Sequence, residues 1–324
     1  MNSCFTPNQS LICQTGLLLC CLALAGPTHA QTQPDKGFDD NQSFKFSLIQ
    51  IPVWVTNKQN RPVAGLERDD FVLTVDNRPV QIDGCMPAYD RPLEAVYLID
   101  MSGSMDIGGK LQGSIQTIDY LLDQHQKEDR WKVILFSDSE VLAIADEKNH
   151  HLWHLNKAKL KGYGKTALYD ALSSSQAYFS KDGLTNRALM LFTDGNDNQS
   201  RLTSEQLMKV LRIIDVPVFI VGIADGFVPS SEAAQEDLGL QTLQEITTIT
   251  GGELFIAKDA HQLPQITTTL NEKMRPQYML SMTVEQKAGD PRRRIDVRIH
   301  RRNNYKVRFR QGYIGSMPEL IGGN

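Results

Sequence analysis

The stretch Val96-Tyr97-Leu98-Ile99-Asp100-Met101-Ser102-Gly103-Ser104-Met105 decides how this chain is interpreted. An apolar run leads into an aspartate, and two serines follow with the spacing Asp-x-Ser-x-Ser. A continuous apolar run is typical of a buried parallel strand, and ligands bind at the carboxyl ends of such strands. Asp100, Ser102 and Ser104 would bring hard oxygen atoms together there, which suits Mg²⁺, Ca²⁺ or Mn²⁺ better than a metal that prefers thiolates. Because Asp, Ser and Gly are also common in turns, the stretch needs partners elsewhere.

Two later stretches supply such partners. Gly164-Lys165-Thr166-Ala167-Leu168 places a hydroxyl at the start of a predicted helix, and Leu191-Phe192-Thr193-Asp194-Gly195 places an acid at the end of another apolar run. Together with the first stretch they resemble the von Willebrand factor A (VWA) family, and the resemblance covers roughly residues 93 to 275. The residues that carry it, in the family's order, are Asp100, Ser102, Ser104, Thr166 and Asp194.

The resemblance implies a metal-ion-dependent adhesion site. In that family these five side chains hold one divalent cation, some directly and some through water, and a coordination position is left open for an acidic group of a partner. On charge alone, two carboxylates leave a doubly charged ion able to attract a third, and Mg²⁺, Mn²⁺ or Ca²⁺ would fit. The alternative is a metal-free, serine-rich turn on a Rossmann-like sheet.

The pattern between residues 93 and 275 predicts the fold. Strands and helices alternate there, so we expect a Rossmann-like, doubly wound α/β domain with a mainly parallel sheet. Thr203 and Gln206 have the spacing of a capping box at a helix start. Predicted strands cover residues 131–136, 188–193, 218–223 and 254–256, with an antiparallel edge strand at 141–145; predicted helices begin near Lys110, Thr166, Ser204, Leu240 and Leu263.

Both ends of the chain look β-rich. Strands are expected at 44–48, 53–55, 71–75, 80–82, 278–284, 295–299 and 307–309, with Pro52 marking an edge or a break in the first. The segment Val63-Ala64-Gly65-Leu66-Glu67-Arg68-Asp69-Asp70-Phe71 resembles the leading segment of bacterial exported VWA-related proteins. We therefore expect a small β-sandwich, built from both ends, into which the α/β domain is inserted. The predicted boundaries are a signal peptide 1–30, a linker 31–43, an N-terminal β segment 44–90, a VWA domain 91–275, a C-terminal β segment 276–315 and a tail 316–324.

The N-terminus predicts export. Residues 16–26 form an apolar core, and Thr28-His29-Ala30 offers small residues at the −3 and −1 positions of a cleavage site. Residues 1–15 lack the Lys or Arg that a signal peptide usually carries, and a buried helix is the alternative. We expect a periplasmic, cell-envelope or secreted protein cleaved near Ala30, without a membrane span in the mature chain. Cleavage would leave Cys85 as the single cysteine, either a reactive or intermolecularly bridged thiol or, as we favour, a small buried hydrophobe.

Composition and charge limit the partners. The chain has 324 residues, 41% of them hydrophobic and 22% charged, with a net charge of −4, which argues against strong attraction to nucleic acid. A basic run near the C-terminus could be an anion-binding patch, but we favour a solvated sheet face with charges that protect an edge. The run consists of Arg292, Arg293, Arg294, Arg298, Arg301, Arg302, Arg308 and Arg310.

Two functional classes are compatible with these motifs. The one we favour is a non-catalytic, cation-dependent binding module for a protein or cell-surface ligand that supplies an acidic residue. The other is a metal-dependent hydrolase or phosphotransferase using Asp100, against which the motifs place Ser102 where an aspartate acid would be expected and provide no His or Glu as a base. His150 and His154 have the spacing of a zinc helix, but His151 replaces the glutamate that such a helix needs. Asp197 and Asp225 border the motifs and suit surface turns equally well.

Overall fold

The computed structural model describes residues 45–138, 141–180, 186–195, 197–223, 233–286, 292–300 and 304–314. The predicted signal peptide at 1–30, the linker at 31–43 and the tail at 316–324 lie outside these residues, as does Asp225. Among the residues described, no helix combines the length and apolar character needed to cross a membrane.

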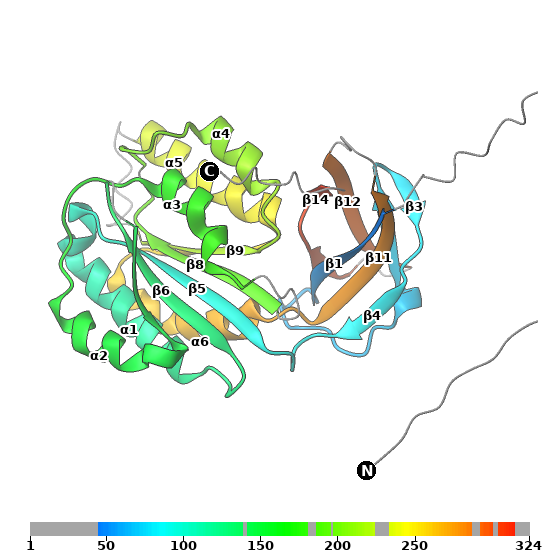
Figure 1. Cartoon of the computed structure of the whole chain (residues 1–324), viewed down its shortest axis with the longest axis horizontal. Helices are drawn as coiled ribbons and strands as arrows, with labels where there is room; N and C mark the ends of the chain where they lie inside the picture. The colour runs from blue at the N-terminus through cyan, green and yellow to red at the C-terminus, as the bar shows by residue number, and fades with distance from the viewer. Residues whose placement is uncertain are drawn as a thin grey trace, which may run out of the picture. The chain divides into compact units, whose positions relative to one another are not determined.

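A six-stranded sheet forms the centre of the α/β part (Figure 1). Its strand order is β10-β9-β8-β5-β6-β7, and every neighbouring pair is parallel except β6 and β7. The predicted α/β fold with a mainly parallel sheet is thus confirmed, including the antiparallel edge strand. The strands are β5 (Leu93–Asp100), β6 (Arg130–Phe136), β7 (Val141–Asp146), β8 (Asn186–Thr193), β9 (Val218–Ile223) and β10 (Leu254–Ala257).

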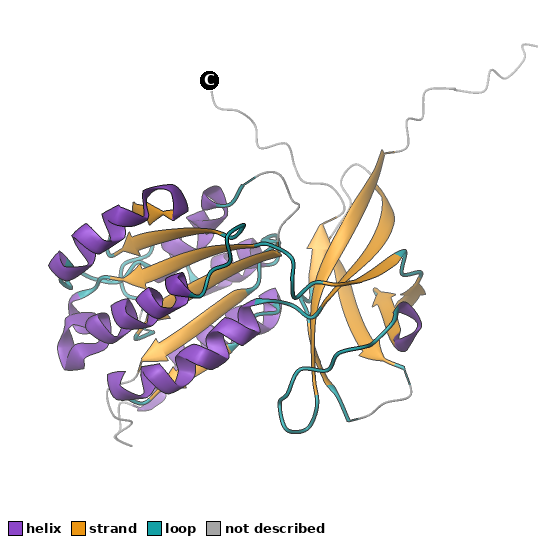
Figure 2. Cartoon of the chain, turned by 90° about the horizontal axis from the view of Figure 1, so that it is seen from below, coloured by secondary structure: helices purple, strands orange, loops and turns teal. Residues whose placement is uncertain are grey.

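Helices cover both faces of this sheet, as Figures 1 and 2 show. One apolar cluster joins the sheet to α1 (Lys110–Asp123), α2 (His150–Asn156) and α6 (Leu263–Met274). A second cluster on the opposite face joins it to α3 (Leu168–Ser174), α4 (Ser204–Leu211) and α5 (Ala233–Thr250). Because both faces are covered, all eight residues of β5 are buried.

The two ends of the chain form two antiparallel sheets of four strands, with the orders β13-β1-β11-β4 and β14-β12-β2-β3. Their facing sides share a third apolar cluster, which includes Val53, Leu73, Leu280 and Val297. This is the expected sandwich, with the α/β part inserted between its N- and C-terminal strands. The strands are β1 (Lys45–Thr56), β2 (Phe71–Val75), β3 (Arg78–Val80), β4 (Gly84–Pro87), β11 (Tyr278–Gln286), β12 (Arg292–Ile299), β13 (Lys306–Arg308) and β14 (Gly312–Ile314).

The segment that resembles exported relatives has a physical role in the sandwich. The Tyr278 hydroxyl donates a hydrogen bond to the Val63 carbonyl at 2.8 Å and accepts one from the Leu66 amide at 3.0 Å. Glu67 and Asp70 form a capping box just before β2. The segment therefore holds the start of β2 against β11.

Pro52 does not break the first strand. β1 runs unbroken through it, and Pro52 pairs with Met279 of β11. On its other side, β13 reaches only Trp54 to Thr56, so Pro52 lies on a locally open edge where its missing N–H costs no ladder bond. Both sequence alternatives, an edge strand and a break at Pro52, were therefore wrong, because β1 is an unbroken inner strand between β13 and β11.

The interpretation of the basic run was wrong for two of its residues. Arg308 packs over the rings of Trp54 and Phe219, at 4.3 and 5.0 Å from their centroids, and Arg310 is 7% exposed and paired with Asp215. Neither side chain belongs to a solvated face or to an anion patch. Arg301 and Arg302 lie outside the described residues, whereas Arg294 and Arg298 are exposed on β12, whose apolar residues alternate with them as expected.

Candidate metal centre

The centre begins with Asp100, which ends β5 and is fully buried. Its Oδ1 accepts a hydrogen bond from the Ser102 amide at 2.8 Å, and its Oδ2 accepts one from the Thr193 hydroxyl at 2.7 Å. Burial raises the pKa of Asp100 to about 6, although the bonds from Thr193 and Ser102 oppose the rise and the nearby charge of Asp194 adds to it. A fixed, desolvated carboxylate of this kind favours a nearby cation.

The two serines continue from this strand end. Ser102 is buried and Ser104 is exposed, yet their hydroxyl oxygens are 3.1 Å apart. The chain then enters a short helical turn, Gly103–Gly109, that leads into α1. Ser102 thus lies inside the protein and Ser104 at its surface. A cation bound to both hydroxyls could therefore be reached by a partner from the solvent.

Thr166 comes from the loop before α3 and is 1% exposed. This loop hydrogen-bonds to the Asp100 loop: the Tyr163 amide donates to the Met101 carbonyl at 2.6 Å, and the Gly103 amide donates to the Gly164 carbonyl at 3.1 Å. The approach is so close that a Cβ at Gly162 would lie 2.6 Å from the Ser102 carbonyl oxygen.

A third segment, after β8, fixes the Thr166 loop. The Thr166 amide donates to the Asn198 side chain at 2.9 Å, and the Asn198 and Gln199 amides donate back to the Thr166 carbonyl at 3.0 and 3.1 Å. Asp197 accepts a hydrogen bond from the Tyr169 amide at 3.3 Å, so it orders the start of α3. These bonds join the loop that carries Asp194 to the one that carries Thr166.

Asp194 has a partner that the sequence did not suggest. The Lys110 ammonium, at the start of α1, donates to Asp194 Oδ2 at 3.0 Å, and both side chains are more than nine-tenths buried. The other oxygen, Asp194 Oδ1, is buried and has no hydrogen-bond partner among the described residues. An unpaired carboxylate oxygen on the turn after β8, close enough to Asp100 to act on its charge, is a donor that a hard divalent cation prefers.

The backbone therefore brings the three loops that carry the five predicted residues to the same edge of the sheet, at the carboxyl ends of β5 and β8. Ile99 pairs with Phe192, which places Asp100 beside Thr193 and next to Asp194. Sequence reasoning missed Thr193, Lys110 and Asn198, which bind Asp100, Asp194 and Thr166. Thr193 stands inside a quoted motif, but its hydroxyl had no sequence signal of its own.

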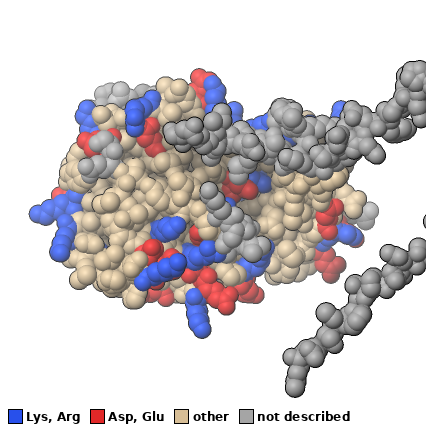
Figure 3. All heavy atoms as spheres, in the orientation of Figure 1, with Lys and Arg blue, Asp and Glu red and all other residues tan. Residues whose placement is uncertain are grey.

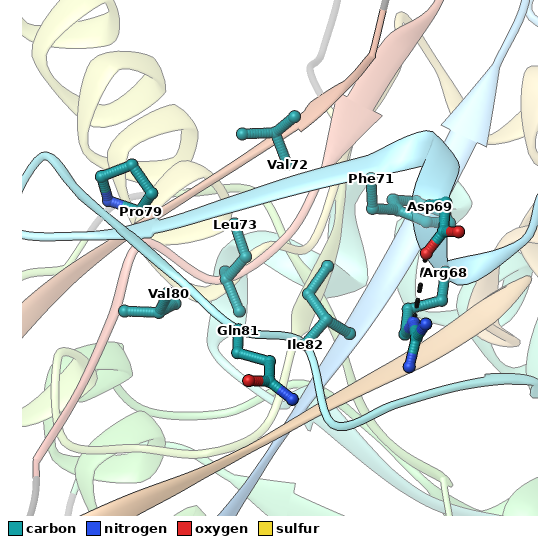
Figure 4. A pocket seen from close by; sticks show the side chains of 9 residues that line it. All are labelled: Arg68, Asp69, Phe71, Val72, Leu73, Pro79, Val80, Gln81 and Ile82. Atoms are coloured by element: carbon teal, nitrogen blue, oxygen red, sulfur yellow. Dashed lines mark hydrogen bonds and ion pairs between the residues drawn. The ribbon is translucent and has the colours of Figure 1, made fainter.

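Elsewhere in the described residues, the side chains give less support for a metal or ligand site. The described residues contain no group of three or more His, Cys, Asp and Glu side chains that could hold a metal, so a cation at the centre would depend on hydroxyl oxygens. A hollow of about 360 Å³ lies along β2, β3 and the chain that follows β3 (Figure 4). Its lining is largely apolar, and its charged residues, Arg68 and Asp69, are exposed and paired with each other at 3.2 Å.

The sequence decides the family. A sequence model of the von Willebrand factor type A domain matches residues 95–269, more than half of the chain. The chain belongs to this family. No curated protein matches the chain in a sequence search.

Solved structures of similar fold share little sequence with this VWA protein. A von Willebrand factor type A protein from Catenulispora acidiphila is 13% identical with a TM-score of 0.48, over 86% of this chain and 76% of that one. Proximal thread matrix protein 1 from the mussel byssus, solved with a zinc-occupied MIDAS motif, is 16% identical with a TM-score of 0.47, over 63% and 50%. The pilus adhesin SpaC from Lactobacillus rhamnosus GG is 16% identical with a TM-score of 0.46, over 68% and 34%. This chain thus matches half or less of the mussel protein and the adhesin.

Proposed function

We propose that this protein is a non-catalytic binding module that engages a protein or cell-surface ligand through a divalent cation. Asp100, Ser102, Ser104, Thr166 and Asp194 would hold Mg²⁺, with Mn²⁺ or Ca²⁺ as alternatives. When bound, the cation supplies a coordination position for an acidic side chain of the partner. The observation that carries the proposal is the unpaired, buried Oδ1 of Asp194 on a turn whose neighbouring strand end carries Asp100 and the paired hydroxyls of Ser102 and Ser104.

The surface around the centre supports binding of an acidic partner. A single carboxylate contact is too small for a stable complex, so neighbouring side chains must contribute affinity. Ile107 and Tyr163, on the two loops that meet at Asp100, are 62% and 52% exposed. Lys161 and Lys165 are exposed beside Tyr163. An acidic residue flanked by an apolar one would suit this surface.

A nucleic-acid partner has less support. On the face shown in Figure 3, Lys and Arg are interspersed with Asp and Glu and do not form one basic field. The net charge of −4 agrees with this pattern.

An enzymatic role has less support than binding. The motifs place Ser102 where an aspartate acid would be expected after Asp100, and they provide no His or Glu as a base. Turnover of generic phosphatase or esterase substrates that disappears in Asp100→Ala would favour the hydrolase or phosphotransferase.

The predicted export remains part of the proposal. Cleavage near Ala30 would place the mature protein in the periplasm, in the cell envelope or outside the cell. N-terminal sequencing of the protein recovered from a periplasmic extract would test this, and a mature chain that still begins at Met1 would contradict it.

Thermal unfolding tests the cation site directly. We expect Mg²⁺ or Mn²⁺ to raise the melting temperature above that of an EDTA control, since a ligand at about 100 times its Kd adds ~2.7 kcal/mol to the stability of the folded state. Asp100→Ala should erase the rise. An unchanged melting temperature in the wild type at saturating Mg²⁺ and Mn²⁺ would contradict the proposal. A pull-down from envelope extract, with and without EDTA, would then search for the partner.

A further inference from the structure

Lys110 places a buried positive charge in the candidate metal centre. Its effect on ion binding rests on the proposed function, in which the centre binds a divalent cation. We infer that Lys110 is a built-in counter-cation that weakens binding of the divalent ion alone and makes binding of the ion depend more strongly on an acidic partner. Its role is to set affinity at the site, although it provides no oxygen ligand to the ion.

The position of the ammonium supports this role. Lys110 Nζ lies 3.0 Å from Asp194 Oδ2, and the lysine side chain is 5% exposed. At this depth water screens charges poorly, so the ammonium acts on every other charge in the centre. Lys110 is the first residue of α1, and its side chain reaches the strand end from the helix start.

The charges can be summed. Asp100 and Asp194 contribute two negative charges and Lys110 one positive charge, so the centre carries a charge of −1 before an ion binds. A divalent cation brings the sum to +1, whereas without Lys110 the sum would be zero. The ion must therefore bind beside a buried cation, and the filled centre keeps a net positive charge.

That remaining charge favours an anion. A carboxylate entering from the solvent side, past Ser104, would return the centre to neutrality. The protein would then bind the ion more tightly when an acidic group is present, and by thermodynamic linkage it would bind the acidic group more tightly when the ion is present. The two ligands are thus positively coupled, and the ammonium strengthens a coupling that coordination of the carboxylate to the ion already provides.

A purely structural role for Lys110 makes a different prediction. If the lysine only satisfied Asp194, its loss would lower stability and would leave ion affinity the same or lower. If it acts as a counter-cation, its loss must raise the affinity for the ion. Lys110 is the cationic partner that the described residues give Asp194, and without it the carboxylate would pair with the ion instead. The sign of the change in ion affinity separates the two roles.

The test measures Mn²⁺ binding from the signal of the free ion in electron paramagnetic resonance. Wild type, Lys110→Met and Lys209→Met are titrated in acetate and in chloride of equal ionic strength, with acetate as the carboxylate probe. Lys209 is an exposed lysine of α4 and controls for the loss of one positive charge. Lys110→Gln, which keeps a donor for Asp194 without the charge, replaces Lys110→Met if the latter does not fold.

Lys110→Met should bind Mn²⁺ more tightly in chloride, on the order of tenfold, because one buried like charge has been removed. Acetate should strengthen binding in the wild type and in Lys209→Met, and much less in Lys110→Met. Equal or weaker binding by both Lys110 variants would overturn the inference and leave the proposed function in place. If no variant binds Mn²⁺, the proposed function fails and the inference fails with it.

Discussion

Thr193 shows how much of the centre depends on a residue that is not one of the five. It is fully buried, donates to Asp100 Oδ2 at 2.7 Å and accepts the Gly195 amide at 3.0 Å. Its hydroxyl thereby fixes both the acid at the end of β5 and the turn that carries Asp194. The two loops share this one side chain.

Thr193→Val keeps the shape of the side chain and removes the hydroxyl. We expect a loss of about 1–3 kcal/mol in the free energy of unfolding in EDTA, since a buried carboxylate oxygen and an amide lose their partner. Urea denaturation measures this loss, and the rise of melting temperature with Mg²⁺ should shrink as well. Thr193→Ser, which keeps the hydroxyl, is the control. A valine variant as stable as the serine variant would show that the hydrogen bond contributes nothing.

At this scale the sequence predicts the residues that are spaced as a motif and misses those defined by distant pairs. Asp100, Ser102 and Ser104 could be found because their spacing is local. The bond between Thr193 and Asp100 spans 93 positions, and the ion pair between Lys110 and Asp194 spans 84. Neither pair has a local sequence pattern. Predicting them would require the register of β5 against β8 and the position of α1, which are tertiary features.

The two loops that meet at the centre give a test at the scale of elements. Gly162→Ala would place a Cβ 2.6 Å from the Ser102 carbonyl oxygen and 2.9 Å from Asp106 Cβ, so the loop before α3 must move away. We expect a modest fall in melting temperature in EDTA and loss of most of the rise with Mg²⁺, because Thr166 moves with that loop.

Gly103→Ala is the matched control for this substitution. Gly103 lies in the Asp100 loop itself, but a Cβ there would have its nearest contact at an ordinary 3.7 Å. This variant should keep its response to Mg²⁺. If both variants respond like the wild type, the close approach of the loops is not needed for binding.

A buried network at the opposite end of β5 predicts a dependence on pH. Asp129 accepts hydrogen bonds from the Leu93 amide and from Arg275, which follows α6, and it contacts His125 at the end of α1. Burial alone would raise the pKa of Asp129, but the bonds from His125, from the Leu93 and Gln126 amides and from Arg275 lower it to about 2.

The sign follows from this lowered pKa. The network stabilises the fold fully above the pKa of the unfolded chain, near 3.9, and its contribution, about 2 kcal/mol, disappears as the pH falls toward 2. Asp129→Asn should therefore lower stability at neutral pH and flatten the loss below about pH 4, measured by urea denaturation across pH. Asp69→Asn, at an acid whose side chain is 86% exposed, should follow the wild type. Parallel pH curves for Asp129→Asn and the wild type would contradict this account.

Elements were easier to predict than their ends. The alternation of apolar runs and capping signals predicted the strands of the sheet and the capping box at Thr203, because each is a local pattern. The helix expected near Thr166 begins instead at Leu168, since the Thr166 backbone is engaged with Asn198 and Gln199. A tertiary contact set this boundary, and no local pattern reports it.

At the scale of the whole molecule, the sequence predicted that both ends of the chain build one sandwich but not how that sandwich is attached. Trp54 of β1 belongs to the apolar core of the α/β part and donates to the Lys273 carbonyl at 2.8 Å. Arg310 bonds to Asp215 and to the Gln50 carbonyl. Arg308 and Arg310, which the sequence suggested were surface charges, instead connect the sandwich to the α/β part. Arginine suits this role because its planar guanidinium group can stack on rings and donate several hydrogen bonds at once.

Arg308 is the residue on which this attachment can be tested. It stacks over Trp54 and Phe219, donates to the Gly251 carbonyl at 2.8 Å and lies 3.6 Å from Glu253, with 23% of its side chain exposed. Arg308→Leu would keep apolar cover on the rings but remove the cation–π contacts and the hydrogen bond. We expect it to lower the free energy of unfolding by about 2–4 kcal/mol.

Arg298→Leu provides the comparison, since Arg298 is an arginine of β12 with 78% of its side chain exposed, paired with Asp296. It should stay within about 0.5 kcal/mol of the wild type. Calorimetry gives the stabilities, and hydrogen exchange shows where protection is lost. In Arg308→Leu the loss should concentrate in β13 and β10, because the side chain links these strands through Glu253 and Gly251. If the two variants lose the same stability, the ring stack does not hold the sandwich to the α/β part, and Trp54 and Arg310 must hold it without Arg308.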